Sequence, residues 1–181
     1  MKNLVAIDVG HIGKPNKLLD KGANYRKVNE ADLVMLYAAL ARGWLEKEGI
    51  PTVFLTYGTY TDRHKFCKQV GVKLHLQCHL NASNGKYGLI GYRAKDSIIC
   101  EPVADIFAKE FKSKLNLIAV NKLVLSKEDK RQGCTVAGTP SLLLEPLFLD
   151  NPKHFEYLTV GDGIDDIAEA ITCSVLTYLG G

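Results

Sequence analysis

Apolar and polar residues alternate along the chain in blocks, and their period switches between that of strands and that of helices. Short apolar runs bounded by turn residues are typical of buried strands, and apolar residues that recur every three or four positions are typical of helices. We therefore expect strands at residues 3–9, 51–57, 73–80, 88–93, 119–125 and 140–145, and helices at 30–48, 61–70, 97–115 and 163–179. This alternation predicts an α/β fold, with a mostly parallel central sheet and helices on both faces.

Length and composition indicate a single domain. The 181 residues contain no repeat, low-complexity tract or interdomain linker, so we expect one domain over residues 1–181. Hydrophobic residues make up 46% of the chain and charged residues 24%, which is ordinary for a soluble globular protein. No run approaches the roughly 20 apolar residues that a membrane span needs, so no membrane span is expected.

The net charge indicates the kind of partner, and the cysteines indicate the compartment. The net charge of +3 suits an anionic partner such as a cell-wall polymer, but no basic run with interleaved aromatic residues indicates nucleic-acid binding. The five cysteines are an odd number, and no two have CxxC spacing. We therefore expect reduced, mostly buried thiols in a product made in the cytoplasm. We also expect the protein to be a monomer. No secretory signal is visible, because Asp8 interrupts the apolar stretch that follows Lys2.

Four ionisable residues stand where predicted elements begin or end. His11 follows the first strand, Glu30 opens the first long helix, His79 ends the third strand, and Glu145 ends an apolar strand. Ligands of open α/β sheets bind beyond the carboxyl ends of the strands, so these side chains are expected to meet at one edge. Each also has a simpler interpretation: His11 as a surface loop histidine, and Glu30 as a carboxylate favoured by the helix N-terminus.

Two histidines and a carboxylate are a ligand set of catalytic zinc sites. Imidazole nitrogens and a carboxylate oxygen bind Zn²⁺ at about 2 Å and leave the fourth position to water, whose pKa the ion lowers to about 7. A second carboxylate that is not a ligand can then accept and pass on the proton, and Glu145 is the candidate.

The other histidines are assigned elsewhere. His75 and His79 lie on one face of the same predicted strand, about 13 Å apart, so they cannot bind one ion. We expect His75 to be an inner histidine with a hydrogen-bond partner. His64 and His154 lie in polar segments and are predicted to be on the surface.

The first part of the chain carries a recognisable order of motifs. The first strand ends in Asp8-Val9-Gly10-His11, Gly22-Ala23 stand in the following loop, and Glu30 opens the helix. Asp-x-Gly-His, Gly-Ala and a helix-opening Glu resemble the start of the zinc-dependent N-acetylmuramoyl-L-alanine amidases, which occur among bacterial cell-wall enzymes and phage endolysins.

The resemblance continues over nearly the whole chain. The segment that begins at Arg63 resembles the family's arginine helix, and residues 77–82 (QCHLNA) resemble its Ser-x-His-x-Asn-Ala strand end. Residues 139–145 (TPSLLLE) resemble the strand that carries the catalytic Glu, and Phe148 and Asn151 match the Phe and Asn that follow it.

This resemblance implies a function and a role for each site residue. His11, Glu30 and His79 would bind Zn²⁺, and Glu145 would be the general base and acid. The implied substrate is peptidoglycan, cleaved at the amide between the lactyl group of N-acetylmuramic acid and L-alanine. The protein would reach the wall after release from the cytoplasm, as phage endolysins do.

Two supporting residues and three departures complete the comparison with the family pattern. Asn81 is expected to hold the loop after His79 or to cap a turn, and Arg63 to make a structural ion pair or a substrate contact. Ile12 and Leu147 stand where the family commonly has Gly, and Gln77 replaces a small Ser. These departures concern loop shape and substrate contacts, and they remove no ligand.

Three other functions are compatible with parts of the pattern. One is a zinc peptidase or small-molecule amidohydrolase on the same scaffold. Another is a wall-binding module without catalysis, which Glu145 argues against because binding needs no proton shuttle. The third takes residues 7–10 (IDVG) as a phosphate loop of a sugar-kinase-like ATPase, which normally needs a longer, two-lobed chain.

Overall fold

Six strands form the central sheet in the computed structural model, which describes residues 3–13 and 20–180. They are β1 (Val5–Val9), β4 (Thr52–Leu55), β5 (Leu74–Cys78), β6 (Gly88–Arg93), β7 (Val120–Leu125) and β8 (Ser141–Glu145), in the spatial order β4-β1-β5-β8-β6-β7. Only the β6–β8 pairing is antiparallel among the pairs of this sheet in the described chain. The predicted fold class, mostly parallel α/β, is confirmed.

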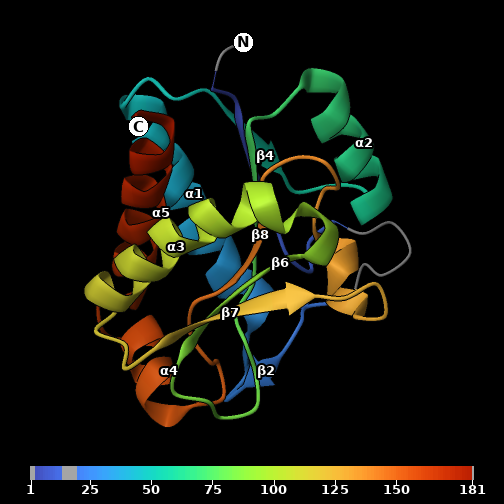
Figure 1. Ribbon diagram of the computed structural model, residues 1–181. Helices are drawn as coiled ribbons and strands as arrows, with labels where there is room; N and C mark the ends of the chain where they lie inside the picture. Colours follow the sequence, from blue (N-terminus) through green and yellow to red (C-terminus); the bar gives the residue numbers. More distant parts are fainter. Residues whose placement is uncertain (1–2, 14–19, 181) are drawn as a thin grey trace.

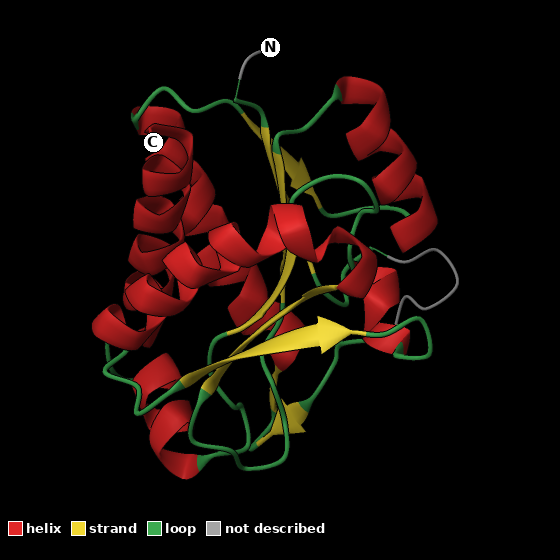
Figure 2. Ribbon diagram, viewed as in Figure 1, coloured by secondary structure: helices red, strands yellow, loops and turns green. Residues whose placement is uncertain are grey.

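Helices cover both faces of the sheet. The described helices are α1 (Glu30–Lys47), α2 (Tyr60–Val70), α3 (Ser97–Lys114), α4 (Pro152–Thr159) and α5 (Gly163–Gly180). Figure 1 shows α1, α3 and α5 together on one side of the sheet and α2 on the other. Figure 2 shows how the loops gather at the two ends of the strands. None of the described helices is long and apolar enough to cross a membrane.

Two short features were not expected. The hairpin of β2 (Asn24–Tyr25) and β3 (Val28–Asn29) has strands of only two residues, too short to show a period of two. The helix α4 has eight residues and begins at a proline. The sequence feature that marks the start of this helix is its N-cap. The Asn151 side chain accepts hydrogen bonds from the backbone N–H groups of Lys153 and His154.

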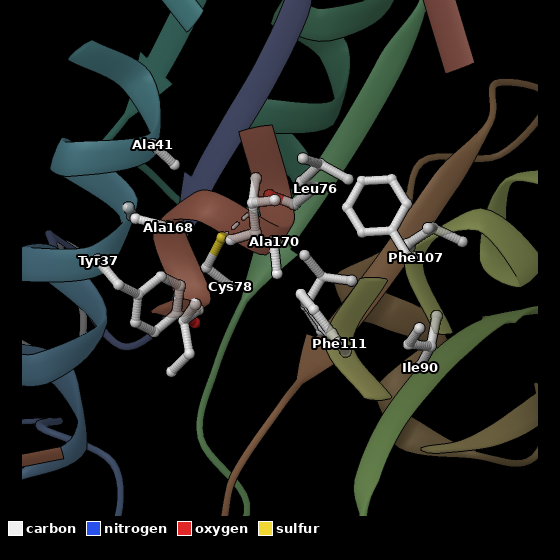
Figure 3. Packing of buried hydrophobic residues seen from close by; sticks show 14 of the residues in the cluster. Tyr37, Ala41, Leu76, Cys78, Ile90, Phe107, Phe111, Ala168 and Ala170 are labelled. Carbon is white, nitrogen blue, oxygen red and sulfur yellow. Dashed lines mark hydrogen bonds between the residues drawn. The ribbon is translucent and has the colours of Figure 1, made fainter. Parts of the chain in front are cut away.

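Alternation along the strands divides their side chains between two faces. Val5, Ile7 and Val9 of β1 point to the larger apolar cluster, under α1, α3 and α5. Aromatic side chains from α1 and α3 fill this core (Figure 3), among them Tyr37, Phe107 and Phe111, which are fully buried. The core thus fixes which residues of each strand face α2.

The face under α2 is apolar at one end and polar at the other. A small cluster that includes Leu4, Ala6 and Cys67 packs at the amino end of β1. Beyond it, the inward positions of β1, β5 and β8 carry Asp8, His75, Gln77, His79, Ser141 and Glu145. Side chains of this kind are costly to bury without partners, so this row is expected to be paired or liganded.

The five cysteines, all within the described residues, are thiols that form no disulfide, as the sequence predicted. Cys67, Cys78 and Cys100 are buried, and Cys134 and Cys173 are half-buried. Burial raises the pKa of the Cys67 thiol to about 12, so this thiol is protonated and inert at physiological pH.

We expect Tyr37→Phe to lower the free energy of unfolding by about 1–2 kcal/mol, because the Tyr37 hydroxyl donates a buried hydrogen bond of 2.9 Å to the carbonyl oxygen of His79. Urea unfolding followed by circular dichroism measures this. The control is Tyr57→Phe, since Tyr57 is 73% exposed. Equal stability of the two variants would contradict the prediction.

Candidate metal centre

His11, Glu30 and His79 lie together at the carboxyl edge of the sheet. Each offers one ligand atom, and these atoms lie within 4.8 Å of one another. Oε2 of Glu30 lies 3.3 Å from Nε2 of His11, and Oε1 lies 2.9 Å from Nδ1 of His79. The two imidazole rings meet edge to face, with their centroids 4.8 Å apart. One carboxylate therefore spans both histidines.

The loop before α1 holds the Glu30 carboxylate in place. The backbone N–H of Ala23 donates to Oε2 at 3.0 Å, and that of Leu80 donates to Oε1 at 3.1 Å. Gly22 has a φ of +70°, and a Cβ at this position would fall 2.4 Å from Oε2 of Glu30. The Gly22-Ala23 pair thus has a physical reason: the glycine lets the loop close over the carboxylate and the alanine N–H binds it.

His11 is held in an unusual backbone conformation. Its φ is +60°, which is uncommon for a residue with a side chain and is often found at functional sites. Its Nδ1 lies 2.9 Å from Oδ1 of Asp20. The sequence did not predict this contact, because Asp20 lies in a loop, where no hydrophobic periodicity indicates which way a side chain points. Gly10 leaves room for the neighbouring ring, since a Cβ there would lie 2.4 Å from Cε1 of His79.

The charges of this centre favour a bound cation. Burial by itself would raise the pKa of Glu30, but hydrogen bonds from His11 and His79 hold the pKa well below its usual range. Burial would likewise lower the pKa of His11, but its contacts with Glu30 and Asp20 raise the pKa above its ordinary value. A histidine between two carboxylates satisfies both only as an imidazolium or with a cation on one side.

The donor set and its spacing fit zinc. Two ligands that each lie about 2.0 Å from a tetrahedral ion are about 3.3 Å apart. The separation of 3.3 Å between Nε2 of His11 and Oε2 of Glu30 matches this value, and Nδ1 of His79 lies 2.9 Å from the other carboxylate oxygen, Oε1. Asp20 behind His11 provides the outer carboxylate that commonly orients a metal-binding histidine.

Glu145 lies beside His79 on the next strand. Cys78 pairs with Leu144 in the parallel β5–β8 ladder, so His79 and Glu145 stand side by side on the same face of the sheet. The Asn81 amide donates to Oε2 of Glu145 at 3.0 Å. Burial raises the pKa of Glu145 to about 7, and the charge of Glu30 adds to the effect. This carboxyl group exchanges a proton near neutral pH.

The loop after His79 is fastened to the segment after Glu145. Asn81 forms an isolated parallel bridge with Phe148, and the Asn151 amide donates to the carbonyl oxygen of Gly85 at 2.9 Å. A Cβ on Gly85 would lie 2.3 Å from the Phe148 ring. Phe148 and Asn151 are therefore parts of the loop's support.

Arg63 makes a buried ion pair with Asp8. Its guanidinium donates to Oδ1 of Asp8, and also to the carbonyl oxygens of Val9 at 2.9 Å and Gly58 at 3.1 Å. A further bond to the carbonyl oxygen of Ile12 ties the loop that follows His11. Arg63 is 2% exposed, so its position is that of a structural ion pair.

A second group of polar side chains lies deeper under α2. His75 is fully buried, with Nδ1 2.8 Å from Oγ of Ser141 and Nε2 3.2 Å from Oδ2 of Asp8, which confirms the expected inner histidine with partners. With its amide nitrogen turned toward Oδ2 of Asp8, at 3.0 Å, Gln77 presents its oxygen to Nε2 of His79. Gln77 thus links the two groups.

The surface positions predicted for His64 and His154 are wrong. Both are half-buried. His64 packs edge to face against His75, and burial lowers its pKa to about 4, so the ring is neutral at physiological pH. Nδ1 of His154 accepts from the backbone N–H of Phe148 at 3.0 Å. In each case a tertiary contact overrides the polar local sequence.

Comparisons with known proteins identify a family and a shared fold. A family model described as N-acetylmuramoyl-L-alanine amidase matches residues 5–177. No curated protein gives a significant match. Among solved structures, the N-acetylmuramoyl-L-alanine amidase AmiC2 of Nostoc punctiforme superposes with a TM-score of 0.82 at 20% identity, covering 100% of this chain and 99% of that one. An N-acetylmuramoyl-L-alanine amidase from Clostridium difficile 630 gives 0.81 at 24% identity, covering 98% and 97%.

We expect Glu145 to make a contribution to the stability of the metal-free protein that is lost as pH rises from about 4.5 to 7, because its raised pKa means that this side chain binds more proton in the folded state than in the unfolded state over that range. Glu145→Gln removes this loss and is more stable above pH 7, by up to about 3 kcal/mol. Urea unfolding with a chelator at pH 5–8 measures it, with Glu48→Gln, at an exposed position, as the control. Parallel pH profiles of wild type and Glu145→Gln would contradict it.

Proposed function

The chain belongs to the family of N-acetylmuramoyl-L-alanine amidases, and from that premise we propose that its peptidoglycan amidase activity uses a zinc ion held by His11, Glu30 and His79. Glu145 is the general base and acid in this proposal. The observation that carries it is the convergence of three ligand atoms within 4.8 Å of one another, with a titratable carboxyl group on the adjacent strand.

Zinc accounts for what the three side chains have in common. They are two imidazoles and one anionic carboxylate, with separations close to those of a tetrahedral site. When bound, the ion lowers the pKa of water to about 7 and polarises a carbonyl group. Asp20 holds the His11 ring and Gln77 the His79 ring, so each histidine presents the nitrogen that faces Glu30.

Glu145 moves the proton. The reaction adds water to the carbonyl carbon of the lactyl group and breaks the bond from that carbon to the nitrogen of L-alanine. Glu145 accepts the proton of the attacking water and then delivers it to the departing nitrogen, which leaves as a free amine. A pKa of about 7 suits both steps, and Asn81 fixes one carboxyl oxygen so that the other is available.

The amidase is favoured over the zinc peptidase that the residue types also allow. The two enzymes share a ligand set, but the family model covers residues 5–177 and bears the name of the amidase. The two differ in the bond that they cleave, so product analysis separates them.

We expect purified peptidoglycan to release stem peptides with a free L-alanine amine, and Glu145→Gln to lower this rate by about 10²–10⁴-fold because the proton shuttle is lost. Mass spectrometry of the digest identifies the products. Chelation abolishes the release, and added zinc restores it.

Glu169→Gln is the control for this experiment, because Glu169 lies on α5, at a distance from the site in sequence and on the opposite face of the sheet. Cleavage within the stem peptide would contradict the amidase reaction. Full activity of Glu145→Gln would contradict the role of Glu145, and activity that survives complete zinc removal would contradict the role of the metal.

We also expect Asp20→Ala to weaken zinc binding by about 10–100-fold, since Asp20 orients His11 without contacting the ion. Competition with a chromophoric chelator measures the affinity. Asp32→Ala, at an exposed position on the first turn of α1, is the control. An unchanged affinity of Asp20→Ala would show that the His11 ring needs no such support.

A further inference from the structure

A second cluster of metal-ligand side chains lies under α2, apart from the centre described above. Asp8, His64 and His75 each offer one ligand atom, and these atoms lie within 4.8 Å of one another. Asp8 and His75 come from the adjacent strands β1 and β5, and His64 comes from α2. We propose that these three side chains form a second site for a divalent cation such as Zn²⁺, with a structural role.

The spacing within the cluster fits such an ion. Nε2 of His75 and Oδ2 of Asp8 are 3.2 Å apart, close to the value of about 3.3 Å for two ligands of a tetrahedral zinc. The His64 ring meets the His75 ring edge to face, with the centroids 5.6 Å apart. Imidazole nitrogens favour zinc, cobalt and nickel over magnesium or calcium.

One nitrogen of this cluster lacks a protein partner. Within residues 3–13 and 20–180, Nε2 of His64 is the buried side-chain atom that has no hydrogen bond. A buried polar atom without a partner destabilises the folded state. The His64 ring is neutral, and in the tautomer with its proton on Nδ1 this nitrogen has a lone pair to donate to a cation. Hydrogen bonding within the cluster satisfies Asp8 and His75 but leaves this atom unused.

The surroundings orient the other two ligands. Nδ1 of His75 lies 2.8 Å from Oγ of Ser141, which fixes the ring so that Nε2 faces Asp8. Arg63 binds Oδ1 of Asp8, and Oδ2 accepts from the Gln77 amide and faces His75. Support behind the ligands in this way is usual in metal sites. The charge of Arg63 opposes a second cation, so we expect zinc to bind here at least about tenfold more weakly than at the first centre.

The role of this site is structural rather than catalytic. The Gln77 side chain stands between the two centres, with one amide atom 3.4 Å from both Oδ1 of Asp8 and Nε2 of His79, so the two ligand sets share no residue. Ions that act together on one substrate lie about 3.5–4 Å apart. An ion bound to Asp8, His64 and His75 instead joins α2 to β1 and β5.

The test counts zinc ions per chain after a chelator-stripped, full-length protein is dialysed against zinc. Elemental mass spectrometry gives the count. We expect two ions in the wild type, one in His64→Gln, one in His11→Gln and none in the double variant. The matched control is His154→Gln, because His154 is also half-buried but lies on α4; it keeps two ions.

Each site fails separately in this experiment. The second site is overturned if His64→Gln binds as many ions as the wild type, or if His11→Gln binds none. The first centre is contradicted if His11→Gln binds as many ions as the wild type, which leaves the second site standing. If circular dichroism shows His64→Gln unfolded, the count for His11→Gln decides: one ion supports the second site and none overturns it.

Discussion

The buried ion pair between Asp8 and Arg63 is the interaction on which the site depends. Asp8 stands on β1, between β4 and β5, and is fully buried where a lone carboxylate is very costly. Arg63 neutralises it and at the same time binds the carbonyl oxygens of Val9 and Ile12, on either side of His11. The end of β1 and the left-handed backbone of His11 are therefore fixed by a side chain of α2.

The Glu30 carboxylate holds segments of the chain together at the carboxyl edge of the sheet. Its carboxylate faces two histidines and two backbone N–H groups, so four contacts converge on one side chain from three segments of the chain. The segments are the ends of β1 and β5 and the loop before α1. Such a carboxylate is preorganised as an anion, and that is what a cation site needs before the ion arrives.

Much of this arrangement was predictable from the sequence, because strand periodicity and the carboxyl-edge rule are strong constraints. The strands that end near His11, His79 and Glu145 were predicted, and the structure brings His11, Glu30 and His79 together. The roles of these residues stay predictions. The contacts of Asp20, Gln77 and His64 were not predictable, since they depend on how a loop and α2 pack on the sheet. Asn29 stands at the N-cap position of α1, but its side chain donates to Asp32 and makes no cap hydrogen bond.

The fastening between the loop after His79 and the segment after Glu145 has a dynamic consequence. The bridge from Asn81 to Phe148 and the bond from Asn151 to Gly85 join the two segments that follow β5 and β8. Thermal motion that lifts one of these segments must carry the other with it. The side chains of His79 and Glu145 are therefore displaced together. The distance between His79 and Glu145 then changes little when the sheet edge moves, and amide exchange in both segments is expected to follow one common opening event.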